Sequence, residues 1–350
     1  MSSVVERLCR DELIKPPKFL QTNIAYETIM GSEAYGTSLQ EKSDKDIYGF
    51  AIPPRDYIFP PSVIPGFGFQ GHKFNQWQQH HIKDTSKACI YDCVILNIVD
   101  VFELARKGNP NIIDMLFVPS TCVLKTTSVG NLVRENRRLF LSKMCYPRYK
   151  GYAYSQLKKV DNKGKSKEMM DIIEFEDTHD LPRSTPYDMI DEEYKKRGST
   201  HLASLDDEDL CQYKHLYTLG KSASGRFERN KIDSFDLKFS YHIVRLLGFA
   251  EQILATHDLD IQQDRERLKA IRRGEWTQED IHNFFNEKEK QLEELYRSST
   301  LQEECSEAKL HQLLMDCLET HYGSLRNIVV RKDEALMALK DIAKIVERFT

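Results

Sequence analysis

The sequence predicts an α+β protein, with a mixed sheet and flanking helices in its front half and only helices in its back half. Up to about residue 135, short apolar runs are separated by Gly and Pro, which is typical of strands bounded by turns. Beyond that point glycines are sparse and apolar residues recur at helical spacing. We therefore expect two domains, at residues 1–135 and 136–350.

The front half begins with two predicted strands joined by a glycine turn. The first strand covers 22–31, and the second covers 45–52, where Pro53-Pro54 stops it. The segment 60–85 is rich in Pro, Gly, Gln and His, so we expect a long loop or an irregular hairpin there. A third strand is expected at 86–92.

Helical elements follow the third strand. Residues 94–107 carry apolar side chains at helical spacing, and Gly108-Asn109-Pro110 ends that helix as a glycine C-cap followed by proline. Residues 112–118 begin another short apolar element, and 134–141 continues toward the next helix.

The back half is predicted to be helical around one irregular segment. A strongly amphipathic helix is expected at 236–255, and further helices at 277–298, 306–320 and 333–349. Residues 161–210 are highly charged with little periodicity. We expect a linker or a partly ordered insertion there, within a charged, mobile segment at about 161–230.

Composition limits the class of protein and the way it can contact nucleic acid. The chain has 350 residues and a formal net charge of -4, so contact with RNA or DNA depends on local basic patches rather than on a global positive field. No run approaches the ~20 apolar residues of a membrane span, and the N-terminus lacks an apolar leader. We therefore expect no membrane partner and a cytoplasmic location, with reduced thiols and no zinc site.

A pair of aspartates at the start of the second predicted strand carries the clearest chemical signal. Alternate side chains of a strand share a face, so Asp44 and Asp46 point the same way and Lys45 points away. Two neighbouring carboxylates repel each other unless a cation lies between them, and their hard oxygen atoms suit Mg²⁺. The pattern favours phosphoryl or nucleotidyl transfer. A solvated surface turn is the alternative.

The wider pattern resembles a known family. Gly-Ser and then Asp-x-Asp resemble the active-site signature of the DNA polymerase β superfamily of nucleotidyltransferases, and the longer motifs resemble its RNA-repair-pathway-associated (RlaP) family of bacteria and large phages. The matching motifs are Gly-Ser-x-Ala-Tyr-Gly-Thr at 31–37, Ser-Asp-x-Asp-x-x-Gly at 43–49, Gly108-Asn109-Pro110 with Asp114-Met115-Leu116-Phe117, Lys238-x-x-x-His242-x-x-Arg245-Leu246, and Ile271-Arg272-x-Gly274-Glu275.

The resemblance implies a minimal polymerase-β-like palm followed by an all-α domain, with two Mg²⁺ (or Mn²⁺) ions and a nucleoside triphosphate as donor. The family's third acidic residue falls on Asp92, with Asp84 as the runner-up. Asp92 is alternatively a simple N-cap for the helix that follows it. The chain departs from the family at Asp114, where relatives often have glutamate, and at 161–230, which has no placed counterpart.

Several residues are expected to bind the nucleotide. Gly31 and Ser32 would cradle the β- and γ-phosphates, because glycine lets the backbone approach and exposed N–H groups supply donors. Thr37 and Ser38 are weaker candidates, equally explained as turn residues. A plain turn is the alternative for the whole segment.

A second group of candidates is cationic. Lys238, His242 and Arg245 lie at i, i+4 and i+7 on one helix face, which suits a triphosphate or an RNA backbone. A charged helix rim is the alternative. Arg272, just before Gly274, is either a nucleotide-binding residue or part of an exposed turn.

Two further patterns are interpreted as structural. The aromatic and basic run at 146–159 resembles a single-strand-binding surface, but tyrosines at this density more often pack in a core. His80-His81 has no partner at ligand spacing and is taken as non-functional.

Together these features predict transfer of a nucleoside monophosphate from a nucleoside triphosphate to a hydroxyl acceptor, with release of pyrophosphate. The nucleotide would bind in a cleft between the two domains. The resemblance favours an RNA end, such as that of tRNA, as acceptor, and places the protein in the host cytoplasm if it is phage-encoded. The alternatives are an adenylyltransferase acting on a protein or small molecule, and a catalytically silent regulator that binds a nucleotide or a partner.

Overall fold

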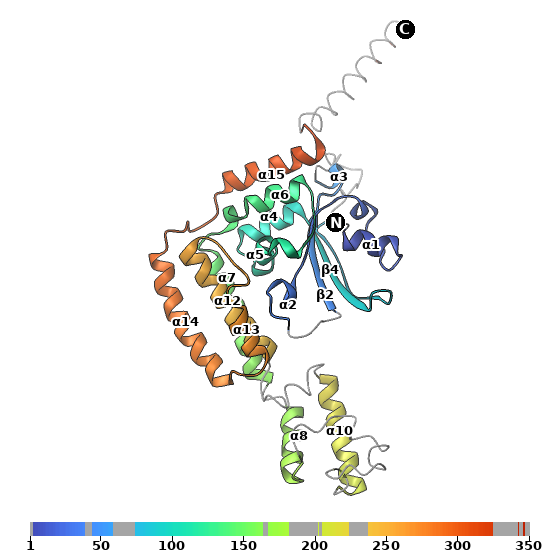
Figure 1. The fold of residues 1–350 in the computed structure, drawn as a ribbon, viewed down its shortest axis with the longest axis vertical. Helices are drawn as coiled ribbons and strands as arrows, with labels where there is room; N and C mark the ends of the chain where they lie inside the picture. The colour runs from blue at the N-terminus through green and yellow to red at the C-terminus, as the bar shows by residue number, and fades with distance from the viewer. Residues whose placement is uncertain are drawn as a thin grey trace. The chain divides into compact units, whose positions relative to one another are not determined.

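The computed structural model describes residues 3–38, 44–58, 74–163, 167–181, 202, 205–223, 237–324, 342 and 346. The chain divides into two compact units (Figure 1). Unit 1 comprises residues 1–148, 252–263 and 299–350, and unit 2 comprises 149–251 and 264–298. In the described residues no helix is long and apolar enough to span a membrane.

Unit 1 contains a five-stranded sheet in the order β3-β4-β2-β1-β5. The strands β2 and β4 are parallel, whereas the other neighbours are antiparallel. The predicted mixed sheet is therefore confirmed. Its strands are β1 (Ile24–Ile29), β2 (Asp44–Ala51), β3 (Gln76–Asp84), β4 (Cys89–Asn97) and β5 (Val123–Thr126).

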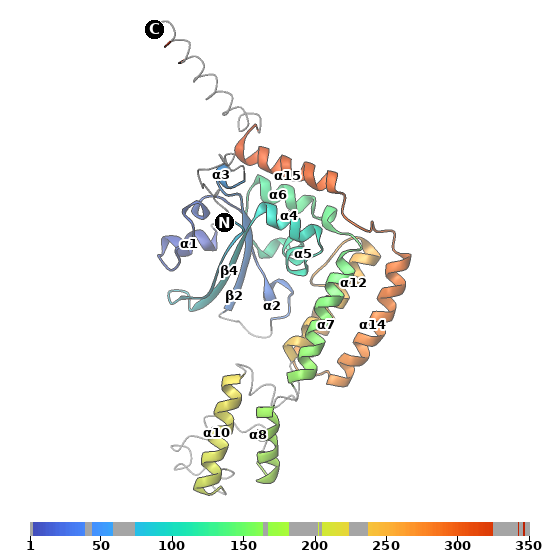
Figure 2. The same ribbon diagram turned by 180° about the vertical axis from the view of Figure 1, so that it is seen from behind.

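Helices cover both faces of this sheet. Figures 1 and 2 show α1 on one side of β2 and β4, and α4 and α5 on the other. The short helical elements of unit 1 are α1 (Val4–Arg10), η1 (Lys18–Gln21), α2 (Gly31–Ala34), α3 (Arg55–Ile58), α4 (Ile98–Arg106), α5 (Pro110–Phe117), η2 (Ser120–Cys122), α6 (Ser128–Glu135) and η3 (Arg137–Phe140).

A buried carboxylate anchors α1 to the sheet. Glu27 of β1 is fully buried and accepts hydrogen bonds from the Ser3 hydroxyl and from the Val4 backbone N–H, the latter at 2.6 Å. These donors lie at the start of α1, where backbone N–H groups lack partners within the helix. Burial raises the pKa of the Glu27 carboxyl. Glu27 and α1 lie on the sheet face opposite Asp46, because Glu27 pairs with Gly49 rather than with an even-numbered residue of β2.

The boundary between β4 and α4 differs from the prediction. Residues 94–97 were expected in a helix, but they continue β4, and α4 begins only at Ile98. A parallel strand buried on both faces is a continuous apolar run, which imitates helical spacing over a few residues. Asn97 caps α4 through its side chain, which accepts from the Val99 backbone N–H. Asp92 is therefore inside a strand, and its interpretation as a helix cap is wrong.

The segment expected to be a loop or irregular hairpin at 60–85 contains β3, which forms an antiparallel pair with β4. The segment therefore supplies one strand, Gln76–Asp84, of a hairpin whose second strand lies beyond residue 85, and the pairing is irregular because its register shifts between Gln79 and Ile82. Residues 59–73 lie outside the described part of the chain.

Long helices dominate the remainder of the chain. The helices expected at 236–255, 277–298 and 306–320 are confirmed, with ends shifted by two residues at most. The helix expected at 333–349 lies outside the described residues, apart from positions 342 and 346. The helices are α7 (Cys145–Lys163), α8 (Lys167–Thr178), α10 (Asp207–Ala223), α12 (Leu237–Thr256), α13 (Arg265–Arg272), α14 (Gln278–Ser298) and α15 (Glu307–Tyr322).

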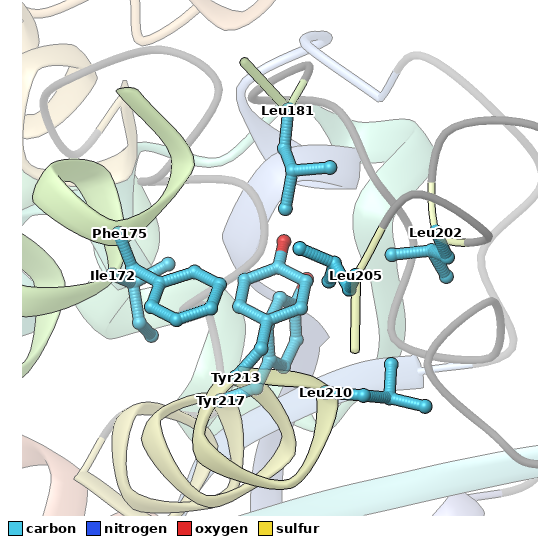
Figure 3. Packing of buried hydrophobic residues seen from close by; sticks show 8 residues of the cluster. All are labelled: Ile172, Phe175, Leu181, Leu202, Leu205, Leu210, Tyr213 and Tyr217. Carbon is cyan, nitrogen blue, oxygen red and sulfur yellow. The ribbon is translucent and has the colours of Figure 1, made fainter. Parts of the chain in front are cut away.

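The charged segment predicted to be a linker contains a small core of its own. The helices α8 and α10 pack together, and the Phe175 and Tyr213 rings stack at a centroid distance of 5.1 Å. The apolar residues of these helices are interspersed with many charged residues, so the sequence alone did not indicate a buried core here. The linker interpretation is wrong for these two helices. Figure 3 shows the buried cluster, which consists of Ile172, Phe175, Leu181, Leu202, Leu205, Leu210, Tyr213 and Tyr217.

Candidate active site

Three carboxylates lie on one face of two neighbouring strands in unit 1. In the parallel pair of β2 and β4, Asp46 lies opposite Asp92, and Asp44 lies opposite Ile90. Residues two apart in a strand point to the same face, and so do residues paired across strands. Asp44, Asp46 and Asp92 therefore share a face, as the sequence predicted for the first two.

These carboxylates lie where the strands leave the core. Asp44 and Asp46 are exposed and the Asp92 side chain is 36% exposed, whereas Ile47 and Phe50 farther along β2 are fully buried. Water and ions can therefore reach the acidic end of the pair, while the apolar end fixes the strands.

A glycine turn lies directly against Asp46. Gly31 has a positive φ of 69°, and a Cβ at this position would lie 2.2 Å from Asp46 Oδ2. The preceding Met30 donates its backbone N–H to the Asp46 carbonyl at 2.8 Å. The turn therefore requires glycine twice, once for the backbone conformation and once for the space that the carboxylate occupies.

Two side-chain hydrogen bonds hold the rest of the turn in place. Tyr35 donates its hydroxyl to the buried Asp114 carboxylate at 2.8 Å, and Gln262 donates its side-chain amide to the Ala34 carbonyl at 2.8 Å. Asp114, at which the chain departs from the family pattern, therefore supports the turn structurally. Thr37 is fully buried and its backbone N–H donates to the Ser32 carbonyl, whereas Ser38 is exposed. Nucleotide contacts by Ser32, Thr37 and Ser38 stay predictions.

A β-bulge in β3 positions Asp92. The pairing of β3 with β4 shifts register between Gln79 and Ile82, and His81 adopts a positive φ of 55°. In this conformation the His81 backbone N–H donates to Asp92 Oδ1 at 2.6 Å, and His80 Nδ1 lies 3.6 Å from Asp92 Oδ2. The sequence interpretation of His80-His81 as non-functional missed this contact, because it depends on strand pairing and not on ligand spacing.

The runner-up for the third acid lies elsewhere. Asp84 pairs with Cys89, three residues from Asp92, so it points to the opposite face of the sheet. There it forms an ion pair with Arg7 of α1 at 2.7 Å. Hydrogen bonding from Ser86, and then from Arg7, lowers the pKa of the Asp84 carboxyl. Asp84 therefore binds α1 to the sheet and is not part of the carboxylate site.

The predicted cationic residues gather in unit 2. Lys238, His242 and Arg245 lie on α12, and Arg272 lies at the end of α13. Arg245 is only 3% exposed, with its Nη2 3.5 Å from His242 Nδ1, and the Arg272 guanidinium lies 5.8 Å from the Tyr241 ring centroid. Tyr241 also packs against His242 at a ring-centroid distance of 5.1 Å, so Arg245, His242 and Arg272 belong to one polar and aromatic group. Contact of Lys238, His242, Arg245 and Arg272 with a nucleotide stays a prediction.

The aromatic run of α7 is divided between core and surface. Tyr146 and Tyr149 are buried, while Tyr152 and Tyr154 are exposed. Packing in the core therefore explains two of these four tyrosines.

Asp44, Asp46 and Asp92 are the candidate ligands of a divalent metal ion. The described residues contain no group of three His, Cys, Asp or Glu side chains already arranged around a metal position. The donor set nevertheless consists of hard oxygen atoms, which Mg²⁺ prefers, and all three carboxylates are open to solvent. The residues therefore fit Mg²⁺ by donor chemistry and by their exposure.

Comparison with known proteins agrees with these observations. A family model described as "RlaP: RNA repair pathway DNA polymerase beta family" matches residues 6–316. No curated protein and no solved structure gives a significant match. The matched region contains Asp44, Asp46, Asp92 and all of the candidate nucleotide-binding residues. The chain therefore belongs to the RlaP family, the RNA repair pathway DNA polymerase beta family.

Proposed function

We propose that this protein is a metal-dependent nucleotidyltransferase that transfers a nucleoside monophosphate from a nucleoside triphosphate to a hydroxyl group of an RNA acceptor, with release of pyrophosphate. The observation that carries the proposal is the register of β2 and β4, which sets Asp46 beside Asp92 and leaves Asp44 on the same face. Three neighbouring carboxylates repel one another, and a bound divalent cation would offset that repulsion.

Each part of the site has a role in this reaction. Asp44, Asp46 and Asp92 would hold two Mg²⁺ (or Mn²⁺) ions. Such ions lower the pKa of an attacking hydroxyl group and stabilise charge on the reacting phosphorus. Gly31 and Ser32 would receive the β- and γ-phosphates through backbone N–H groups and the serine hydroxyl. Weaker candidates for phosphate contact, Thr37 and Ser38, follow in the same turn.

The cationic residues of unit 2 supply the second part of the proposal. Lys238, His242, Arg245 and Arg272 would neutralise the triphosphate or the RNA backbone, since guanidinium groups pair with phosphate oxygens in a bidentate way. Arg245 Nη2 already lies 3.5 Å from His242 Nδ1, and the Arg245 guanidinium carbon lies 5.4 Å from the centroid of the Phe249 ring. Its orientation is therefore fixed before any ligand binds.

The proposed acceptor is an RNA end, such as that of tRNA, and the support is the family's description as part of an RNA repair pathway. A protein or small-molecule acceptor would use the same carboxylates. A silent nucleotide-binding or partner-binding regulator would keep the fold without turnover.

Incubation with each labelled nucleoside triphosphate, Mg²⁺ or Mn²⁺, and a mixture of RNA and protein tests the proposal. We expect label on RNA with wild type and none with Asp46→Asn or Asp92→Asn. Asp84→Asn is the matched control, because it removes a carboxylate from the opposite face of the same sheet. It should retain labelling although it loses the Arg7 ion pair. Label on protein alone would exclude the RNA acceptor, and nucleotide binding without pyrophosphate release would favour the silent regulator.

A further inference from the structure

A pocket in unit 2 is lined by none of the candidate active-site or nucleotide-binding residues. It is formed by α13, the turn that follows it, and α14, with a volume of about 290 Å³. This volume is near the lower end of the range for small-ligand sites. Its lining residues are Arg267, Trp276, Phe284, Glu287, Lys288 and Gln291.

Two aromatic rings form one wall of the pocket. The Trp276 and Phe284 rings pack edge to face, with a centroid distance of 5.7 Å and an interplanar angle of 67°. Both side chains are only partly buried, whereas the neighbouring Phe285 is 3% exposed and belongs to the core. Trp276 therefore retains ring surface that a further flat, apolar group can cover.

The Trp276 and Phe284 rings do not cap the N-terminus of α14. Thr277 and Asp280 cap it reciprocally: the Thr277 backbone N–H donates to Asp280 Oδ2 at 2.8 Å, and the Asp280 backbone N–H donates to Thr277 Oγ1 at 3.1 Å. This arrangement satisfies the N-terminus of the helix. A tryptophan just before the cap is consequently not required for helix formation, and its partial exposure calls for another explanation.

Two cations flank the same ring. The Arg267 guanidinium carbon lies 5.9 Å from the Phe284 centroid, and Lys288 Nζ lies 5.8 Å from it. Lys288 is neutralised by Glu251, whose two carboxylate oxygens each lie 2.8 Å from Nζ. Among the residues that the structure describes, the ion pair of Arg267 is a looser 3.7 Å contact with Asp264, and its side chain is 43% exposed. Arg267 is thus the cation of the pocket that remains able to bind an anion.

An aromatic surface with an exposed guanidinium at its edge suits one class of ligand. Unpaired bases stack on aromatic side chains, and the adjoining phosphate pairs with a cation. Glu287 and Gln291 add hydrogen-bonding groups to the lining, which base edges can use. We propose that this pocket binds an unpaired base of single-stranded RNA, stacked on the Trp276 ring beside Phe284, with Arg267 at the neighbouring phosphate. The choice of RNA rests on the proposed function.

The chain offers a direct optical test, because it has two tryptophans. Trp77→Phe removes the one in β3, so that the fluorescence of the full-length protein reports on Trp276 alone. Single-stranded oligo(A) and oligo(U) are titrated into this variant at physiological salt, and a fully paired RNA duplex is the control. We expect quenching by the single strands and little by the duplex, whose bases are already stacked. No quenching by either single strand would overturn the proposal.

Pocket variants then test the individual contacts. Trp276→Leu keeps an apolar side chain but removes the stacking surface, and Arg267→Gln removes the charge. We expect each to weaken single-strand binding about tenfold, the size typical of one base–aromatic stack or one strong phosphate contact. Trp276→Phe should restore most of the affinity lost in Trp276→Leu. Leu219→Ala, at an exposed residue of unit 2 outside the pocket lining, should leave binding unchanged. Equal affinity in all variants would contradict the proposal.

The same preparations separate this inference from the proposed function. Quenching of Trp276 without any nucleotide transfer would refute the nucleotidyltransferase activity and support the RNA pocket. Transfer to RNA with no quenching and no effect of the pocket variants would support the activity and refute the pocket.

Discussion

The substitution Gly31→Ala tests the geometry of the carboxylate site at a single atom. The added Cβ would lie 2.2 Å from Asp46 Oδ2, which is more than 1 Å inside ordinary van der Waals contact. The clashing atom is the far end of an exposed side chain, so Asp46 can rotate away at little cost in stability. The backbone is a second source of strain, because φ is 69° and a left-handed conformation costs an L-residue roughly 1–2 kcal/mol.

The expected result is therefore a modest loss of stability with a large loss of function. Denaturant unfolding should show the free energy of unfolding lowered by about 1–2 kcal/mol, while nucleotide transfer falls to background because the Asp46 carboxylate no longer faces Asp92.

Gly323→Ala is the matched control, since Gly323 has a φ of 81° and a Cβ added there would have no atom within 4 Å. Its ψ of −158° lies in a region that is essentially restricted to glycine, so this variant should lose at least as much stability as Gly31→Ala and still keep full transfer. Full transfer in Gly31→Ala would refute the contact with Asp46, and loss of transfer in Gly323→Ala would show that strain alone abolishes activity.

Three further contacts of unit 1 can be tested by substitution, two beside the carboxylate site and one on the opposite face of the sheet. His81→Gly keeps the backbone N–H and the positive φ that hold Asp92 and should retain transfer, whereas His81→Pro removes this donor and should abolish it; equal activities would contradict the role of the bulge. Burial raises the pKa of the Glu27 carboxyl in the folded protein above its ordinary value of 4.5. The stability that the protonated carboxyl contributes is therefore complete below pH 4.5, and it is lost as the pH rises through the pKa of the folded state. The free energy of unfolding of wild type relative to Glu27→Gln should therefore fall as pH rises from 4.5, and a difference independent of pH would show that Glu27 does not titrate in this way. Tyr35→Phe leaves the buried Asp114 carboxylate without this donor and should cost about 1–3 kcal/mol of unfolding free energy, measured by denaturant titration; an unchanged value would mean that the bond does not support the turn.

Local features of the site could be predicted from the sequence. The alternation of a strand placed Asp44 and Asp46 on one face, and the need for a tight turn drew attention to Gly31. Both inferences depend on local sequence and on the assignment of one strand, which the structure confirms at Asp44–Ala51.

Features that depend on strand pairing could not be predicted in this way. The position of Asp92 beside Asp46 came from family resemblance, because the pairing of β2 with β4 joins segments more than 40 residues apart. The same dependence concealed the contact between His81 and Asp92. Residues 94–97 imitated a helix because a strand buried on both faces loses its period-two pattern.

The helices α8 and α10 were concealed for a different reason. Their charged outer faces dominate the composition, and the apolar residues of their common core are divided between two short segments separated by other sequence. Neither segment alone shows enough apolar surface to predict burial, and only their packing reveals it.

The central claim is that the carboxylates of β2 and β4 jointly hold divalent cations, and Mn²⁺ binding measured by electron paramagnetic resonance with a non-hydrolysable nucleoside triphosphate tests it most directly. We predict two bound ions in wild type and in Asp84→Asn, and a loss of bound Mn²⁺ in both Asp46→Asn and Asp92→Asn. Wild-type binding in both Asp46→Asn and Asp92→Asn would contradict the claim.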